Sequence, residues 1–210
     1  MDYKNFIYRF SSSLILISLF VLFISFFEVN IKIIVYLIYL IILLEILIYF
    51  RENLFNFLFT LIYLLISFIC FELYFQNYYF KNTFLFLIFL VITFDISSYL
   101  LGSYFGKLKI FPKISPNKTI LGLVSGFFIT YIIGYLLNDY FNFINKYISF
   151  YFIFFIIFFA FIGDIIESIF KRNANIKDSS QLIPGHGGFF DRFDGFIMNV
   201  IFLYFFYLFK

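Results

Sequence analysis

The sequence predicts an all-α fold, a polytopic integral membrane bundle of about seven transmembrane helices. Of its 210 residues 64% are hydrophobic, and the mean hydropathy is +1.02. A soluble domain is only about half apolar, so this composition excludes a water-soluble fold. Apolar runs close to the length of a membrane-spanning helix recur along the whole chain.

Seven apolar runs give the predicted spans in chain order. They cover residues 11–27, 32–50, 54–75, 83–101, 120–137, 148–170 and 195–209. The first follows Lys4 and Arg9 as in a signal peptide, but no small-residue cleavage site comes after it, so a retained helix is expected. The last, at about 15 residues, is short for a bilayer.

Basic residues are distributed unequally between the loops. With seven spans, eleven Lys and Arg fall on the side of the N-terminus and the two long polar loops, 102–119 and 171–194, and four fall on the other side. The positive-inside rule then predicts a protein of the inner or cell membrane whose polar loops face the cytoplasm. Residues 1–90 contain apolar helices with little functional information, and the polar signals are concentrated in residues 91–210.

Two sets of polar residues lie on predicted helices at the spacing i, i+3, i+4, i+7, which places each set on one helix face. The sets are Asp95, Ser98, Tyr99 and Gly102, and Asp164, Glu167, Ser168 and Lys171. Carboxylates inside a membrane are costly and usually face a polar cavity, so we expect one cavity open to the cytoplasm. The alternative is a structural role, with Asp164 and Lys171 as an ion pair. Glu45 and Glu72 are interpreted as structural or helix-terminal.

The loop 102–119 carries Lys107, Lys109, Lys113 and Lys118 between glycines and prolines. The run from Ser115 to Thr119 is interpreted as the start of the next helix, where free backbone N–H groups would face an anion. The alternative is an ordinary loop that binds only acidic headgroups.

The loop 171–194 combines a glycine-rich turn at 184–188 with Asp191 and Asp194, and Lys177 and Asp178 precede the turn. A set of carboxylates with one His and no nearby Cys suits Mg²⁺ rather than Zn²⁺. Metal carboxylates, basic residues and a glycine turn are what phosphoryl and nucleotidyl transfer require. Taken singly, the acids are also explained as a helix cap and the glycines as a plain turn.

The same loop resembles the signature of the phosphatidate cytidylyltransferases, or CDP-diacylglycerol synthases. The residues that carry the resemblance are Ser168-x-x-Lys171-Arg172, Lys177-Asp178 and Pro184-Gly185-His186-Gly187-Gly188-x-x-Asp191-Arg192-x-Asp194. Weaker similarity covers the segments 95–106, 114–122 and 163–168. Ser98 stands where the family usually has Ala, and Leu121 stands where it usually has Glu.

The resemblance implies an enzyme that joins CTP to phosphatidic acid and releases pyrophosphate, with membrane lipids as its other partners and no nucleic acid. It implies that Asp178 and Asp191 hold Mg²⁺, with Asp194 and Asp164 completing the site. A second cation and a homodimer stay open.

The remaining roles implied by the resemblance concern the phosphates of the two substrates. Their charge would be neutralised by Lys171, Arg172, Lys177 and Arg192, and they would be bound by Ser115, Lys118, Ser168, Gly185, His186, Gly187 and Gly188. Alternatives are a related CTP-dependent enzyme, such as a polyprenol or phytol kinase or an archaeol cytidylyltransferase, and an ion or solute transporter. Transporters often contain inverted repeats, and none is found.

Overall fold

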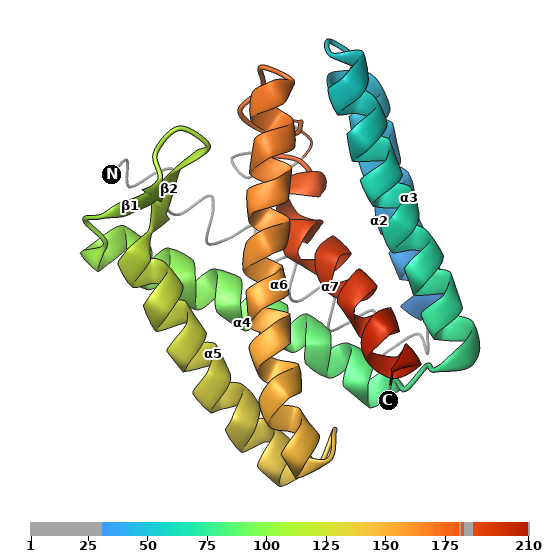
Figure 1. Ribbon diagram of the computed structural model, residues 1–210, viewed down its shortest axis with the longest axis vertical. Coiled ribbons are helices and arrows are strands. Elements are labelled where there is room, and N and C mark those ends of the chain that lie inside the picture. The colour runs from blue at the N-terminus through green and yellow to red at the C-terminus, as the bar shows by residue number, and fades with distance from the viewer. Residues whose placement is uncertain (1–30, 181, 183–186, 210) are drawn as a thin grey trace.

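The computed structural model describes residues 31–180, 182 and 187–209, and within them it forms six helices and one small sheet (Figure 1). The helices are α2 (Ile31–Tyr49), α3 (Leu54–Asn77), α4 (Lys81–Phe105), α5 (Ile120–Phe141), α6 (Lys146–Asn173) and α7 (Phe190–Leu208). The strands are β1 (Lys109–Phe111) and β2 (Ser115–Thr119). The predicted span 11–27 lies outside the described residues.

Five of these helices, α2 to α6, are long and apolar enough to cross a membrane. Many of their large apolar side chains point outward. Ile62, Phe128 and Tyr151, for example, are 49%, 59% and 62% exposed. So large an apolar surface is unfavourable in water, whereas in a membrane it would be covered by lipid chains. The chain is therefore an integral membrane protein with an all-α architecture, as the sequence predicts.

The predicted boundary of the last span was wrong. The helix α7 begins at Phe190 rather than at residue 195, so Asp191, Arg192 and Asp194 belong to its first turns. An acidic residue in the first turn is favourable because it faces the positive end of the helix dipole. Within the described part of the chain α7 is not among the helices apolar enough to span, so the number of seven spans is approximate.

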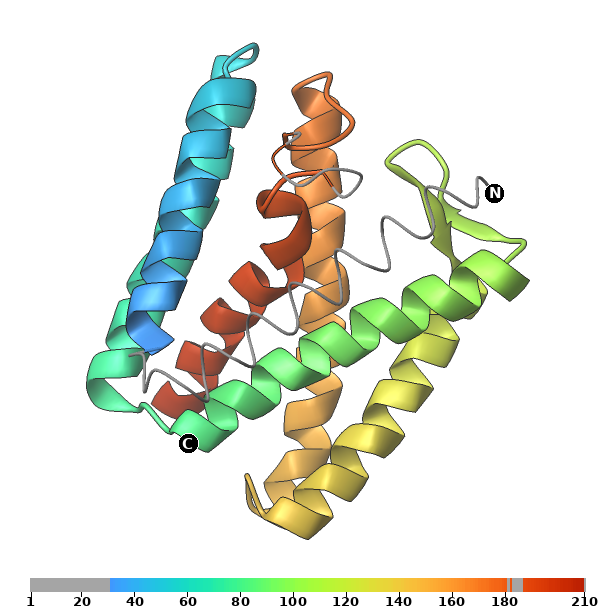
Figure 2. The same ribbon diagram turned by 180° about the vertical axis from the view of Figure 1, so that it is seen from behind.

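The helices are arranged around α6 and α7. The helices α2 and α3 lie side by side on one flank, while α4 crosses the bundle obliquely and α5 returns along it (Figures 1 and 2). Contacts link α7 to both α6 and α3, and α5 to both α4 and α6. The helix α7 thus connects the α2–α3 pair to the rest of the bundle.

Buried polar side chains fix the position of the α2–α3 pair against α6 and α7. The Ser67 hydroxyl on α3 lies 2.5 Å from the Tyr39 hydroxyl on α2 and donates to the Ile197 carbonyl on α7 at 2.8 Å. The Asn56 amide of α3 donates to the Phe170 carbonyl of α6 at 2.9 Å. Such bonds inside an apolar bundle favour one relative placement of the helices, because any other leaves buried polar groups unpaired.

Gly163 allows α6 and α7 to approach closely. A Cβ atom at this position would lie 2.5 Å from the Asp194 carbonyl oxygen, so no other residue fits without moving one of the helices. This close approach brings Asp164, the next residue on α6, toward Asp194 on α7.

The polar loop 102–119 contains an antiparallel hairpin that the sequence did not predict. Lys109 pairs with Thr119 and Phe111 with Ser115, with an irregularity in between. Ser115 therefore lies in β2 and does not begin a helix. The helix α5 begins at Ile120, capped by the Thr119 hydroxyl, which accepts a hydrogen bond from the Gly122 N–H at 3.1 Å. Pro116 is tolerated in β2 because a two-stranded sheet has only edge strands.

Candidate active site

A polar cavity of about 620 Å³ opens between α4, the hairpin, α6 and the start of α7. Its lining includes Asp95, Ser98, Tyr99 and Gly102 from α4, Ser115 and Lys118 from β2, Asp164, Glu167 and Lys171 from α6, and Asp191, Arg192 and Asp194 from α7. The two helix faces and the two polar loops therefore meet at one cavity, as their spacing predicts. Ser168 is buried and is absent from this lining.

Three carboxylates of the cavity lining lie close together. One oxygen each of Asp164, Glu167 and Asp194 lies within 4.8 Å of the other two. Asp164 and Glu167 share a face of α6 because they are three residues apart, and the close approach at Gly163 supplies Asp194. Glu167 and Asp194 are buried, whereas Asp164 is partly open to the cavity.

This carboxylate cluster fits a hard divalent cation. Its donors are all oxygens, which Mg²⁺ prefers. In addition, the Glu167 Oε1 atom is buried and has no hydrogen-bond partner among the described residues. A buried acceptor without a partner is costly, and a cation bound between the three carboxylates would remove that cost. The sequence does not indicate Glu167 as a metal ligand, although its spacing places it on the same helix face as Asp164.

Two lysines bring positive charge to the cluster. Lys118 reaches in from β2, forms an ion pair with Asp164 and lies 5.2 Å from the centre of the Phe161 ring. Lys171 is bound between Glu167 at 2.9 Å and Asp191 at 2.7 Å. Both lysines line the cavity, so their charge is available to an anionic ligand.

Asp191 is bound mainly by its own loop. Its Oδ1 atom accepts from Lys171, and its Oδ2 atom accepts from the Ser179 N–H at 2.9 Å, the Ser179 hydroxyl at 3.1 Å and the Gly188 N–H at 2.8 Å. Burial alone raises the pKa of the Asp191 carboxyl, but the hydrogen bonds that the carboxyl accepts and the charge of Lys171 outweigh burial and lower the pKa to about 2. Asp191 thus stays ionised and ties the start of α7 to α6.

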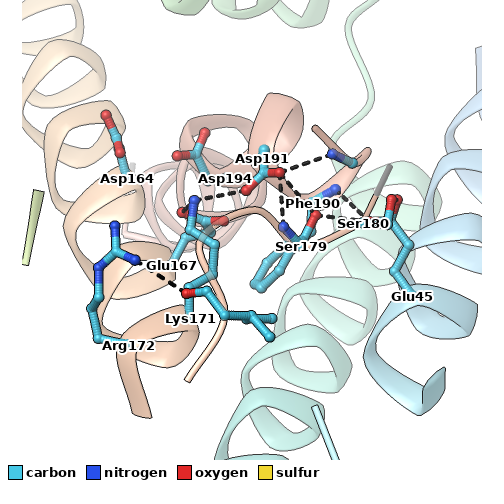
Figure 3. Close-up of polar contacts among 12 residues, drawn as sticks. Glu45, Asp164, Glu167, Lys171, Arg172, Ser179, Ser180, Phe190, Asp191 and Asp194 are labelled. Atoms are coloured by element: carbon cyan, nitrogen blue, oxygen red, sulfur yellow. Dashed lines mark hydrogen bonds and ion pairs between the residues drawn. The ribbon is translucent and has the colours of Figure 1, made fainter. Parts of the chain in front are cut away.

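Glu45 of α2 meets the same loop from the opposite side (Figure 3). Its carboxylate accepts from the hydroxyls of Ser179 and Ser180 and from the backbone N–H groups of Phe189 and Phe190. The sequence indicates only a structural or helix-terminal role for Glu45, without a link to this loop. The one sequence feature that indicates such a contact is an isolated carboxylate among the apolar residues of a spanning helix, because a carboxylate inside a membrane needs a polar partner. Glu72, by contrast, pairs with Lys32 at 2.9 Å.

Several predicted site residues lie away from the cluster. Lys177 and Asp178 are exposed and are absent from the cavity lining. The Arg172 guanidinium donates to the carbonyls of Ile114 at 3.0 Å and Ile176 at 3.1 Å, and so ties the hairpin to the end of α6. Of the predicted metal ligands, Asp164 and Asp194 belong to the carboxylate cluster, Asp191 is linked to it through Lys171, and Asp178 lies beside Gly187.

The glycine turn is described only in part, since Gly185 and His186 lie outside the described residues. Gly187 has a φ of 81°, a conformation that favours glycine. Gly188 is buried, and a Cβ there would lie 2.1 Å from the Ser179 hydroxyl oxygen and 2.5 Å from Glu45 Oε1. Their binding of substrate stays a prediction.

We expect Lys171→Met to destabilise the fold strongly, because it leaves the buried Glu167 and Asp191 carboxylates without a cation. Removing one partner of a buried ion pair costs about 3–5 kcal/mol. The matched control is Lys146→Met, because Lys146 forms an exposed pair with Asp139 at 2.6 Å, and such pairs contribute about 0–1 kcal/mol. Thermal unfolding in detergent should give a much larger loss of Tm for Lys171→Met. Equal losses would show that the Lys171 network is not a structural centre.

Comparison with known proteins places this site in context. A family model described as "Cytidylyltransferase family" matches residues 2–209. Three proteins named phosphatidate cytidylyltransferase are similar over shorter regions. The Bacillus subtilis protein is 35% identical over 112 residues, which are 53% of this chain and 42% of that protein.

The other two relatives give a similar picture. The Staphylococcus aureus protein is 36% identical over 104 residues, 49% of this chain and 40% of that protein. The Haemophilus influenzae protein is 35% identical over 120 residues, 55% of this chain and 42% of that protein. The chain thus matches about two fifths of the length of these relatives.

Proposed function

Because the chain belongs to the cytidylyltransferase family, we propose that it condenses CTP with phosphatidic acid to form CDP-diacylglycerol and pyrophosphate. The observation that carries the proposal is a polar cavity, with three carboxylates and basic side chains, that adjoins an apolar groove between membrane helices. One substrate is a polyanionic nucleotide and the other is a membrane lipid, so the reaction needs both surfaces in contact.

The polar cavity supplies the groups for the phosphates. Asp164, Glu167 and Asp194 would hold Mg²⁺, which when bound offsets negative charge on the phosphates. Lys118, Lys171 and Arg192 line the same cavity and would neutralise the remaining charge. The binding of Mg²⁺, the binding of CTP and the phosphate-binding roles of these residues are proposed together with the reaction.

The bond changes need no strong general base. A phosphate oxygen of phosphatidic acid would attack the α-phosphorus of CTP, and the bond from that phosphorus to the bridging oxygen would break and release pyrophosphate. The attacking phosphate is already ionised at neutral pH, so the cavity residues would act by holding the two anions together and by stabilising the charge that shifts to pyrophosphate.

The apolar groove supports a lipid as the second substrate. It has a volume of about 270 Å³ and is lined by Leu123, Val124, Phe127, Phe128, Ile157, Phe158 and Phe161 of α5 and α6. Leu123 and Phe161 also line the polar cavity, so the two spaces share a border. A phosphatidic acid molecule would place its phosphate in the cavity and an acyl chain in the groove.

The carboxylate cluster can be tested by assay. We expect Asp194→Asn to reduce Mg²⁺-dependent formation of CDP-diacylglycerol from labelled CTP and phosphatidic acid by at least about 100-fold, because it removes charge where Mg²⁺ would bind. The matched control is Asp139→Asn, an exposed carboxylate paired with Lys146, which should retain full activity. Unchanged turnover in Asp194→Asn would refute the assignment of the cluster, and turnover with a prenol in place of phosphatidic acid would redirect the function.

The groove can be tested by filling it. Val124→Trp should raise the KM for long-chain phosphatidic acid about ten-fold and leave the KM for CTP unchanged, because the indole would occupy space left for an acyl chain. Ile132→Trp is the control, since Ile132 is exposed on α5 but outside the groove. A rise in both KM values, or in neither, would argue against acyl-chain binding there.

We propose that the cavity faces the cytoplasm, because the polar loops carry most of the basic residues. Cys70 is the single cysteine and is buried, so an added cysteine can be labelled selectively. We expect Lys113→Cys, in the hairpin turn, to react with an impermeant thiol reagent only in inverted vesicles. Lys146→Cys, at the first residue of α6, should react only in intact cells. The reverse pattern would invert the topology.

A further inference from the structure

The Glu45 carboxylate is enclosed by the polar segment between α6 and α7 (Figure 3). Only 1% of the Glu45 residue surface is exposed. Its Oε1 atom accepts from the Ser180 hydroxyl at 2.6 Å and the Phe189 N–H at 2.8 Å. Its Oε2 atom accepts from the Phe190 N–H at 2.9 Å and the Ser179 hydroxyl at 3.2 Å. All four donors belong to the described residues 179–180 and 187–190, which we call the signature loop.

Glu45 caps the start of α7 from a different helix. Phe189 is the residue before α7 and makes no side-chain cap of its own. The first N–H groups of a helix have no partner within the helix, and they carry a partial positive charge. The Glu45 carboxylate accepts from two of them, so its buried charge and the helix start stabilise each other.

A continuous set of contacts leads from Glu45 to the carboxylate cluster. The Ser179 hydroxyl lies within hydrogen-bond distance of both Glu45, at 3.2 Å, and Asp191, at 3.1 Å. Asp191 then contacts Lys171 at 2.7 Å, and Lys171 contacts Glu167 at 2.9 Å. Glu167 is a member of the cluster.

The space around Glu45 leaves the loop little freedom. Gly188 packs so closely that a Cβ atom there would lie 2.5 Å from Glu45 Oε1 and 2.7 Å from the Ser180 hydroxyl oxygen. The Gly188 N–H also donates to Asp191 at 2.8 Å. The loop is therefore held on one side by α2 and on the other by Asp191.

We propose that Glu45 is a positioning residue, which fixes the signature loop so that Asp191 and Lys171 are correctly placed against the carboxylate cluster. It does not itself line the cavity. The catalytic consequence rests on the proposed function, but the effect on the loop does not. A residue that only stabilises the bundle would instead change overall stability and leave the loop and the catalytic rate of the folded protein unaltered.

The test compares Glu45→Gln with the wild type, using the full chain purified in detergent. The substitution replaces one acceptor oxygen of Glu45 with an NH₂ group, which is itself a donor and would face the four donors of the signature loop. The loop should therefore be held less firmly. We expect trypsin to cleave after the exposed Lys177 about ten-fold faster, while cleavage after Lys113 in the hairpin is unchanged. We also expect kcat to fall about ten-fold, the Mg²⁺ concentration for half-maximal activity to rise, and the KM for phosphatidic acid to stay within about two-fold. Glu45→Asp keeps the charge and should restore part of both effects.

The matched control is Glu72→Gln, which removes another glutamate of the α2–α3 pair, one bound to Lys32 and not to the loop. It should change neither cleavage after Lys177 nor kcat. Unchanged cleavage in folded Glu45→Gln overturns the proposal, and so does faster cleavage with an unchanged kcat.

The two proposals fail in different ways. If the wild type forms no CDP-diacylglycerol, the proposed function fails, and cleavage after Lys177 still decides whether Glu45 holds the loop. If Glu45→Gln does not fold, Ser180→Ala takes its place, because it removes one of the four donors. It should speed cleavage about three-fold, and no change would overturn the proposal.

Discussion

The ion pairs of Lys171 with Glu167 and Asp191 are the interactions on which the rest of the site depends. Burying any one of these charges alone in an apolar bundle would cost much desolvation free energy. The ion pairs and their hydrogen bonds offset that cost. Lys171 lies in the last turn of α6 and Asp191 in the first turn of α7. Their ion pair therefore holds the end of α6 beside the start of α7. The carboxylate cluster, the loop and the position of the cavity all follow from this junction.

The polar cavity also depends on the close packing of apolar helices. Gly163 brings α6 and α7 together, and Gly102 and Gly122 do the same for α4 and α5, where a Cβ on Gly122 would lie 2.9 Å from the Gly102 Cα. The hairpin follows α4 and leads into α5, and this arrangement brings Lys118 over Asp164. Small residues in the helices thus determine where the charged ones meet.

Most helices and the shared cavity could be predicted from the sequence, because apolar run length and i, i+3, i+4 spacing are local properties. The hairpin could not, because its strands have only three and five residues and the second contains Pro116, which argues against a strand. The carboxylate cluster could be predicted only in part, since the resemblance pointed to Asp164 and Asp194 but not to Glu167. Glu45 could not be predicted as a partner of the loop, because the chain between them is long and no local pattern reports on such a contact.

The separation of Glu45 from its partners also bears on how the protein assembles. The N–H groups that it accepts belong to residues 144 and 145 positions later in the chain. During synthesis α2 therefore enters the membrane with a carboxylate whose partners do not yet exist, and the contact forms only when α7 has been made. Contacts of this sequence separation form late and slowly. The loop that completes the site would thus be ordered by one of the last steps of folding, which keeps a partly made chain from presenting a finished site.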